Sequence, residues 1–164
     1  MIIRDEQAKD ADAIHVVTEA AFAGHPHSDG SEPGIVAGLR AAGALTLSLV
    51  AEEAGAVVGH VAFSPVTIDG RDLGWLGLGP ISILPTRQGQ GIGSALIHEG
   101  MARLTGRGDR GIVLLGEPAF YARFGFACHR GLVLPGLPAS YFMALALQGD
   151  VPEGVVAYHP AFGI

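Results

Sequence analysis

The apolar positions of the chain follow two spacings, one typical of helices and one typical of strands. Ala11, Ile14, Val17 and Phe22 recur at helical spacing and predict a helix over residues 7–23. Denser apolar stretches predict strands instead, over residues 2–4, 45–52, 57–68, 73–84, 112–115 and 141–147. Helices and strands therefore alternate along the chain, which indicates an α/β fold.

Local signals mark where these elements begin and end. Ser31, Glu32 and Pro33 are typical of a helix start, and Gly43 of the stop of that helix. Asp69-Gly70 predicts a tight hairpin turn into the strand that follows. A third helix is expected over residues 92–105. The resulting order, β-α-α-β-β-β-α-β-α-β, predicts a mixed, largely antiparallel central sheet flanked by helices.

Length and composition restrict the class of protein. A chain of 164 residues, 49% of them hydrophobic, is expected to form a single domain over residues 1–164. It has no apolar run of the length, about 18 residues, that would span a membrane. The first residues lack the layout of a signal peptide, so we expect a cytoplasmic protein with no membrane partner.

Charge and cysteine content narrow the function further. The formal net charge is −6 and the arginines are scattered, which argues against nucleic acid as a partner. The single cysteine, Cys128, excludes an internal disulfide framework, and we interpret it as a small buried hydrophobic residue. His25, His27 and His60 have no acidic or cysteine partners at ligand spacing, so no metal site is expected.

The most informative segment is a glycine-rich loop between a strand and a helix. Gly89, Gly91 and Gly93 lie in this loop, which leads directly into the apolar helix. A helix start carries unused backbone N–H groups and a positive dipole end, so the segment is typical of a diphosphate site. A P-loop is excluded because the only lysine is Lys9, and the dinucleotide spacing fails because Ser94 stands at the third glycine position.

Two motifs resemble those of the GNAT N-acetyltransferases. The first is Gln88-x-x-Gly91-x-Gly93, which resembles the coenzyme A loop of that family. The second is the segment of residues 118–126, which is similar to the short Tyr-x-Arg-x-Gly-Phe helix, with Tyr121 at its tyrosine position. Pro118 suits the first helical position and Gly125 the residue after the helix end. The motifs occur in the family's order, and the resemblance extends over nearly the whole chain.

The resemblance implies a site and a coenzyme. In the family, the strand before the loop splays from its neighbour, and its freed backbone binds the pantetheine and the thioester carbonyl. Here that strand end is residues 79–83, where Pro80 lacks an N–H. The implied acetyl-CoA-binding residues are Ile81, Ser82, Ile83, Arg87, Gln88, Gly89, Gln90, Gly91, Ile92, Gly93, Ser94, Phe120, Tyr121 and Arg123. One departure is Leu114, which replaces an asparagine that helps to hold the pantetheine in many members.

The expected activity is acetyl transfer from acetyl-CoA to a primary amine by direct attack in a ternary complex. Tyr121 is the candidate general acid for the leaving thiolate, with amphipathic packing as the alternative. Glu32 is the candidate base, with a helix N-terminal charge as the alternative. The acceptor stays open between small molecules and peptide or protein amines, and the family resemblance allows a homodimer. The alternative function is a non-catalytic acyl-CoA-binding or sensing domain; a structural protein with an empty loop is a third.

Overall fold

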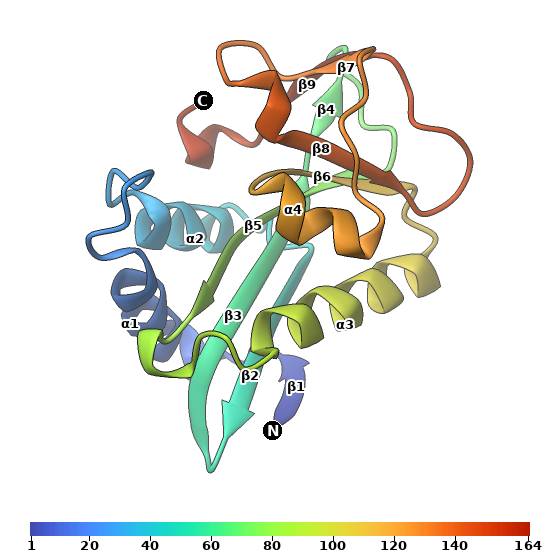
Figure 1. The fold of residues 1–164 in the computed structure, drawn as a ribbon. Coiled ribbons are helices and arrows are strands. Elements are labelled where there is room, and N and C mark those ends of the chain that lie inside the picture. Colours follow the sequence, from blue (N-terminus) through green and yellow to red (C-terminus); the bar gives the residue numbers. More distant parts are fainter. The chain divides into compact units, whose positions relative to one another are not determined.

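The computed structural model describes residues 1–164, and its elements are labelled in Figure 1. The helices are α1 (Ala11–Phe22), α2 (Glu32–Ala41), α3 (Ile92–Arg107) and α4 (Pro118–Tyr121). The strands are β1 (Ile2–Asp5), β2 (Leu47–Glu53), β3 (Ala56–Pro65), β4 (Thr67–Ile68), β5 (Trp75–Ile83), β6 (Gly111–Leu115), β7 (Leu132–Val133), β8 (Phe142–Ala146) and β9 (Gly154–Ala157). No helix is both long enough and apolar enough to cross a membrane.

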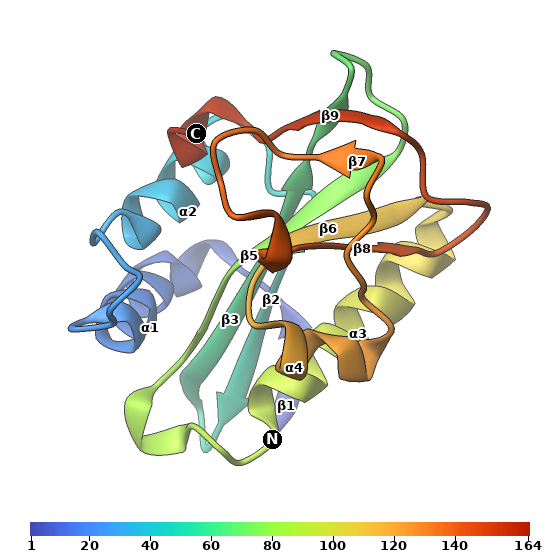
Figure 2. The same cartoon turned by 45° about the horizontal axis from the view of Figure 1, so that its top comes forward.

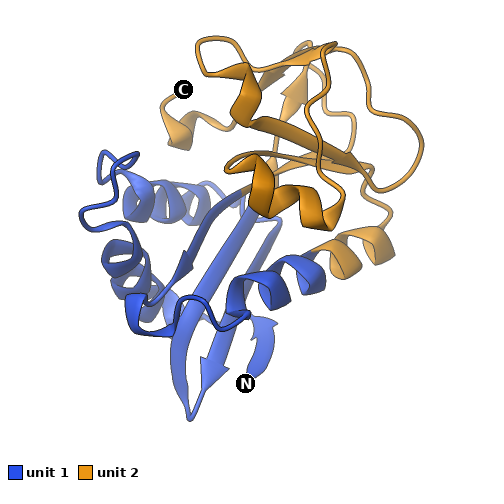
Figure 3. Cartoon of the chain, in the orientation of Figure 1, with its two compact units in different colours: residues 1–63, 79–100 blue, residues 64–78, 101–164 orange.

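The chain forms two compact units, drawn in different colours in Figure 3. Unit 1 comprises residues 1–63 and 79–100, and unit 2 comprises residues 64–78 and 101–164. β3, β5 and α3 each contribute residues to both units. The expectation of a single acetyltransferase domain over residues 1–164 stays a prediction.

In unit 1, helices cover both faces of an antiparallel sheet. β2 pairs with β1 and with β3, and Val50 lies opposite His60 in this register. Val50 packs with Ile14 of α1 and Val36 of α2. Gly59, the neighbour of His60, points to the other face, where a Cβ would contact Ile92 and Leu96 of α3. Because successive strand residues face opposite sides, α1 and α2 cover one face and the start of α3 covers the other.

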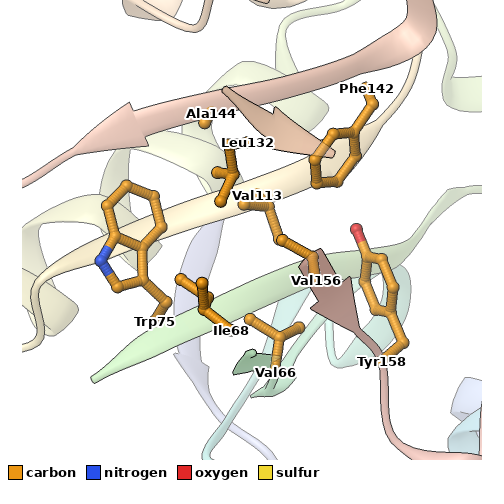
Figure 4. Close-up of a cluster of buried hydrophobic side chains, with 9 residues drawn as sticks. All are labelled: Val66, Ile68, Trp75, Val113, Leu132, Phe142, Ala144, Val156 and Tyr158. Carbon is orange, nitrogen blue, oxygen red and sulfur yellow. The ribbon is translucent and has the colours of Figure 1, made fainter. Parts of the chain in front are cut away.

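Unit 2 combines a second stretch of sheet with a small separate ladder. β6 pairs antiparallel with β8 and parallel with the first residues of β5. Figure 2 shows β7 and β9 side by side, and β9 also pairs with β4. A buried cluster joins the two ladders, as Figure 4 shows: Val66, Ile68, Trp75, Val113, Leu132, Phe142, Ala144, Val156 and Tyr158. The hydroxyl end of Tyr158 enters this cluster on the Phe142 side.

The fold class predicted from the sequence is confirmed. The hydrogen-bonded strand order is β1-β2-β3-β5-β6-β8. β5 and β6 pair in parallel, whereas the pairs β1–β2, β2–β3 and β6–β8 are antiparallel. The six long strands lie within two or three residues of their predicted ends. The short strands β4, β7 and β9 were not predicted as separate elements, because two to four residues carry too little periodicity to be recognised.

The predicted turn and stop signals are also confirmed. Asp69 and Gly70 both have positive φ, at 52° and 75°, and Ile68 and Arg71 exchange two backbone hydrogen bonds across them. This is the two-residue hairpin turn that Asp-Gly favours. α2 ends at Ala41, and Gly43 follows in the left-handed region at φ 67°. Ser31 occupies the N-cap position, although its side chain makes no capping hydrogen bond.

Candidate functional site

The end of β5 leaves its parallel partner before the glycine loop begins. The ladder between β5 and β6 ends at Gly77 opposite Val113, although β5 continues to Ile83. Gly79 has φ 141°, which favours glycine, and Pro80 has no N–H to donate. The expected end of strand pairing near Pro80 therefore matches the structure. The backbone of residues 81–83 continues beyond the last rung of that ladder.

Side chains of the same segment alternate between two environments. Ser82 is buried at 1% exposure, whereas Ile81 and Ile83 are half-buried. Ile83 points to the α3 side, where its Cδ1 would lie 3.0 Å from a Cβ on Gly59. Ile92, another predicted site residue, packs on the same face at 4% exposure. The side chains thus pack in unit 1 while the backbone is the part of the segment that can contact a ligand.

Two glycines of the loop between β5 and α3 have a left-handed backbone conformation. Gly89 and Gly91 have φ values of 75° and 84°, in the left-handed region that residues with a Cβ disfavour. The first helical hydrogen bond of α3 runs from Ala95 N–H to Gly91 O, at 3.0 Å. The N–H groups of residues 92–94 precede it and have no partner within the helix. Three amides at a helix start, next to glycines, fit the diphosphate of a coenzyme.

Gly93 differs from the other two glycines of the loop. It has helical rather than positive φ, and a Cβ at this position would meet only Ile83 Cγ1, at 3.9 Å. No neighbouring protein atom therefore requires a glycine here. Since glycine weakens a helix relative to alanine, the absence of a side chain at Gly93 is consistent with close approach of a ligand.

The polar side chains of the loop bind protein groups. Gln88 donates from Nε2 to the carbonyl of Ile83 at 3.1 Å, which joins the loop to the end of β5. Arg87 forms an ion pair with Glu53 of β2, 2.5 Å between Nη2 and Oε2, and makes a long hydrogen bond of 3.4 Å to Gln90. Ser94 is half-buried in the first turn of α3. The role expected for Arg87 as a phosphate contact stays a prediction.

The second motif forms the short helix that the sequence predicts. Pro118 is the first residue of α4, which continues as a 3-10 turn over Ala122–Phe124. Gly125 follows with φ 99°, and its N–H donates to Ala122 O at 3.1 Å. A left-handed glycine after the last turn is a common helix end, so the motif's glycine has a conformational reason.

Tyr121 lies in a mostly apolar setting within unit 2. Its ring makes edge contacts with Phe120 and Phe126, at centroid distances of 4.9 and 6.1 Å. It also lies against Gly116, where any Cβ would overlap with the ring. Burial raises the pKa of the Tyr121 phenol from 10 to about 12, because the charged phenolate is poorly solvated there. The side chain is therefore protonated at neutral pH and able to donate.

Phe120 and Arg123, two other predicted site residues, contact each other. The guanidinium of Arg123 lies 4.4 Å from the centroid of the Phe120 ring, and its Nε donates to Phe120 O at 3.2 Å. These contacts hold the Arg123 guanidinium against an aromatic ring of the short helix, and its role as a coenzyme contact stays a prediction. Phe120 is half-buried, and its ring also packs on Phe124 at 5.4 Å.

Glu32, the candidate base, is bound to a neighbouring loop. Ser28 donates its hydroxyl to Glu32 Oε1, and Glu32 is the first residue of α2. This position agrees with the helix N-terminal charge considered as the alternative. His25 and His27 lie exposed in the same loop, where His25 Nδ1 accepts the N–H of His27 at 3.2 Å. No cluster of three or more His, Cys, Asp or Glu side chains could hold a metal ion. The prediction that Cys128 is buried is wrong: its side chain is exposed, and its Sγ donates to Ser140 O at 3.4 Å.

The sequence did not predict the hydrogen-bonded polar side chains that surround His60 of β3 in unit 1. His60 is fully buried, and its Nε2 lies 2.8 Å from the hydroxyl of Ser48. Ser48 donates to Glu6, which binds Arg40. Only His60 drew attention in the sequence, as a strand residue. Inward-facing Ser48 and His60 in otherwise apolar strands were the available signal, but the residues that join them are far apart in sequence.

A family model and a curated relative both identify the chain as similar to N-acetyltransferases. The family model described as an acetyltransferase (GNAT) domain matches residues 45–128. A curated relative from Escherichia coli, the uncharacterized N-acetyltransferase YhbS, is 40% identical over 99% of this chain and 98% of its own length.

Two solved structures extend the similarity to the fold. A GNAT family acetyltransferase from Brucella melitensis, in complex with acetyl-CoA, is 55% identical with a TM-score of 0.89, covering 98% of this chain and 97% of that one. The YhbS structure from Escherichia coli, in complex with CoA, is 37% identical with a TM-score of 0.91, covering 99% and 92% of the two chains.

Proposed function

Because the chain belongs to the GNAT acetyltransferase family, we propose that it moves an acetyl group from acetyl-CoA to a primary amine. The amine attacks the thioester directly while both substrates are bound. The N–C bond forms, the C–S bond breaks, and coenzyme A leaves as its thiol.

The observation that carries this proposal is the start of α3. Residues 92–94 present three amides without helical partners, next to Gly89 and Gly91 in left-handed conformations. Diphosphate is the group that such amides and the helix dipole favour. The Brucella and Escherichia coli proteins with this fold were crystallised with acetyl-CoA and CoA, which supports the same ligand here. In the proposal, the loop residues 87–94 bind the diphosphate.

The thioester end of the coenzyme is assigned to the end of β5. The backbone of Ile81, Ser82 and Ile83 lies beyond the last rung of the β5–β6 ladder and can pair with the pantetheine amides. One backbone N–H there would donate to the thioester oxygen as it gains charge; such a donor contributes about 3–4 kcal/mol in favourable cases. The side chain of Leu114, buried at 1% exposure in β6, has no hydrogen-bonding group, so the proposal assigns the pantetheine contacts to the β5 backbone.

Two side chains have proposed chemical roles. Tyr121 donates its phenol proton to the departing thiolate, for which a protonated group in apolar surroundings is suited. Glu32 stays the weaker candidate for the base, because Ser28 already binds its carboxylate. Phe120 and Arg123 are proposed to border the coenzyme from the tyrosine helix.

Two measurements test the proposal. Calorimetric titration with acetyl-CoA asks whether the coenzyme binds, and release of the coenzyme A thiol in the presence of a panel of primary amines asks whether acetyl is transferred. Mass spectrometry of the amine products excludes simple hydrolysis. Intersecting initial-velocity patterns, and no acetyl adduct on the exposed Cys128 after mixing with acetyl-CoA alone, are expected for direct attack.

The outcomes separate the candidate functions. Failure to bind acetyl-CoA would remove the coenzyme assignment. Tight binding without acetylation of any amine in the panel would favour the non-catalytic acyl-CoA-binding or sensing domain. Parallel velocity patterns with an acetyl-cysteine that reacts fast enough would overturn direct attack and leave the coenzyme site intact.

A further inference from the structure

The glycine loop between β5 and α3 is attached to the β2–β3 hairpin by one side chain. Arg87 Nη2 forms an ion pair with Glu53 Oε2, at 2.5 Å. Arg87 Nη1 donates to Gln90 Oε1 in a long hydrogen bond of 3.4 Å. Figure 2 shows the loop running past the end of this hairpin. A clamp of Glu53, Arg87 and Gln90 thus connects a strand end to the glycine loop, within unit 1.

Glu53 lies at a tight turn, which limits where its carboxylate can be. It is the last residue of β2 and pairs with Ala56, the first residue of β3. Ala54 and Gly55 connect the two strands, both with positive φ, at 52° and 80°. A two-residue turn with positive φ at both positions is a preferred hairpin connection, because its twist matches that of the strands. The clamp therefore starts from a well-defined part of the sheet.

The loop on the other side of the clamp contains the residues that are hardest to order. Leu84 N–H donates to Val58 O of β3 at 2.9 Å, and Arg87 N–H donates to Leu84 O at 2.8 Å. Gly89 and Gly91 follow in left-handed conformations. Glycine loses more conformational freedom than any other residue when its backbone is fixed. A ligand that needs the loop in one conformation must offset this entropy, unless the protein has already ordered the loop.

Side chains hold the loop at two points. Gln88 Nε2 donates to Ile83 O at 3.1 Å. Gln90 is bound by Arg87, which Glu53 holds in turn. These contacts of Arg87 use Nη1 and Nη2, so its Nε–H stays available to a phosphate oxygen. The clamp can therefore order the loop and keep a cation beside it.

We propose that Glu53 is a positioning residue for acetyl-CoA: it holds Arg87, and through it Gln90, so that the glycine loop is ordered before the coenzyme binds. This rests on the function proposed above. The diphosphate then meets the amides of residues 92–94 without the cost of ordering the loop. Glu53 acts only through Arg87 and does not touch the coenzyme. The ion pair is neutral as a whole, so its carboxylate adds little repulsion for an anionic ligand.

The charge of Glu53 makes the proposal testable by the direction of an effect. A carboxylate that acted as an isolated charge would repel the anionic coenzyme, so its removal would raise the affinity. A carboxylate that positions Arg87 strengthens binding, so its removal should lower the affinity. The side chains of Glu53 and Arg87 are 35% and 34% exposed, so added salt should screen the pair and reduce the effect.

The test compares Glu53→Ala with Glu52→Ala in the full chain. Glu52 is the matched control, because it is the neighbouring residue, carries the same charge and binds Arg4 at 3.0 Å instead of the loop. Arg4 keeps its two hydrogen bonds to Asp10 in that control. Calorimetry with acetyl-CoA should give a Kd raised about threefold to fivefold in Glu53→Ala and unchanged in Glu52→Ala. With an amine that the screen identifies, the KM for acetyl-CoA should rise, while kcat and the KM for the amine stay as in the wild type.

A double-mutant cycle asks whether Glu53 acts through Arg87. Glu53→Ala should raise the Kd of acetyl-CoA in the wild type and not in Arg87→Gln. Hydrogen exchange of the free protein gives a readout that a purely electrostatic role would not move. The amides of residues 88–91 should exchange faster in Glu53→Ala, and saturating acetyl-CoA should remove the difference. Urea unfolding should show the same overall stability, because the pair lies at the surface.

The opposite outcomes would overturn the positioning role. An unchanged or higher affinity in Glu53→Ala would show that its carboxylate is a solvated or a repelling charge. An equal loss of affinity in the Arg87→Gln background, or unchanged exchange of the loop amides, would show that Glu53 does not act by holding Arg87. A wild type that fails to bind acetyl-CoA would instead remove the proposed function itself, and this result is distinct because the comparison of variants needs a wild type that binds.

Discussion

The ring of Tyr121 lies so close to Gly116 that a Cβ on this glycine would overlap with the ring. Gly116 follows β6 directly, and Tyr121 is the last residue of α4. The glycine therefore sets how closely the tyrosine helix approaches the end of β6 within unit 2. Its role is one of space, since Gly116 does not have positive φ.

Gly116→Ala is expected to displace the Tyr121 ring. Insertion of a methyl group into such a contact costs about 1–3 kcal/mol of stability, and kcat should fall if the position of the phenol matters. Gly106→Ala is the control, because that helical glycine of α3 has open space around its Cβ direction. Urea unfolding of both variants checks the stability, and the control should be as stable as the wild type or more so. A fully stable, fully active Gly116→Ala would contradict the packing argument.

Tyr121→Phe removes the hydroxyl group of Tyr121 and keeps its ring. The variant keeps the contacts with Phe120 and Phe126, so its stability should change little. kcat should drop at least about tenfold, since general acid help is commonly worth 10²–10⁴-fold. The drop should be smaller for an acyl donor whose thiolate is a better leaving group, because that thiolate needs less protonation.

The pH dependence gives a second check on Tyr121. Its pKa is raised to about 12, so the donating form persists below that pH. If deprotonation of Tyr121 lowered kcat between pH 8 and 10, the wild type would show a decrease that Tyr121→Phe lacks. We expect no such decrease. Equal kcat in the two proteins, measured where chemistry limits the rate, would leave Tyr121 as a packing residue.

Gly93→Ala distinguishes an effect on coenzyme binding from an effect on the fold. The new Cβ would meet only Ile83 Cγ1, at the ordinary contact distance of 3.9 Å, so the fold should be stabilised by up to about 1 kcal/mol. Acetyl-CoA affinity should nevertheless fall if the diphosphate approaches this backbone. We therefore expect thermal unfolding to show a higher melting temperature and calorimetry to show a lower affinity for acetyl-CoA. Unchanged affinity would show that the coenzyme does not approach Gly93. Gly91→Ala is a poorer probe, because φ 84° adds backbone strain to any effect on the ligand.

The features that could be predicted from the sequence are those that depend on residues adjacent in the chain. The glycine loop, the Asp69-Gly70 turn and the Pro118 and Gly125 helix limits each rest on local conformational preferences, and the structure has all of them. Their meaning as a coenzyme site came from the family resemblance, since a glycine-rich strand-to-helix loop alone is not specific.

The hydrogen bonds that link Glu6, Ser48 and His60 could not be predicted in the same way. Glu6, Ser48 and His60 meet only because β1, β2 and β3 pair in one particular register. A change of register by one residue would point Ser48 and His60 to the opposite face. The partners of Arg87 and Glu32, namely Glu53 and Ser28, likewise became visible only in three dimensions.

His60 also makes a prediction for the stability of the fold. Its pKa is about 4 in the folded chain and near 6.5 when unfolded, so the unfolded state binds more protons between these values. The contribution of His60 to the free energy of unfolding is therefore fully present above pH 6.5, and it is lost as the pH falls toward 4. Acidification from pH 7.5 to 5 should lower the free energy of unfolding by about 2 kcal/mol. The lowered pKa values of Glu6 and Asp10 add their own losses only below about pH 4.5, since both carboxyls stay ionised above it.

Urea unfolding at pH 7.5, 6.5, 5.5 and 5 measures this slope. His60→Gln removes the titrating ring and should flatten the slope in this window, even if the variant is less stable at every pH. His15→Gln is the control, because His15 is exposed on α1 next to Glu19, and it should keep the wild-type slope. The slope follows from the burial of His60, which is the main cause of its lowered pKa. An identical slope in wild type and His60→Gln would contradict this prediction, because it would mean that burial does not lower the pKa of His60 in the folded chain.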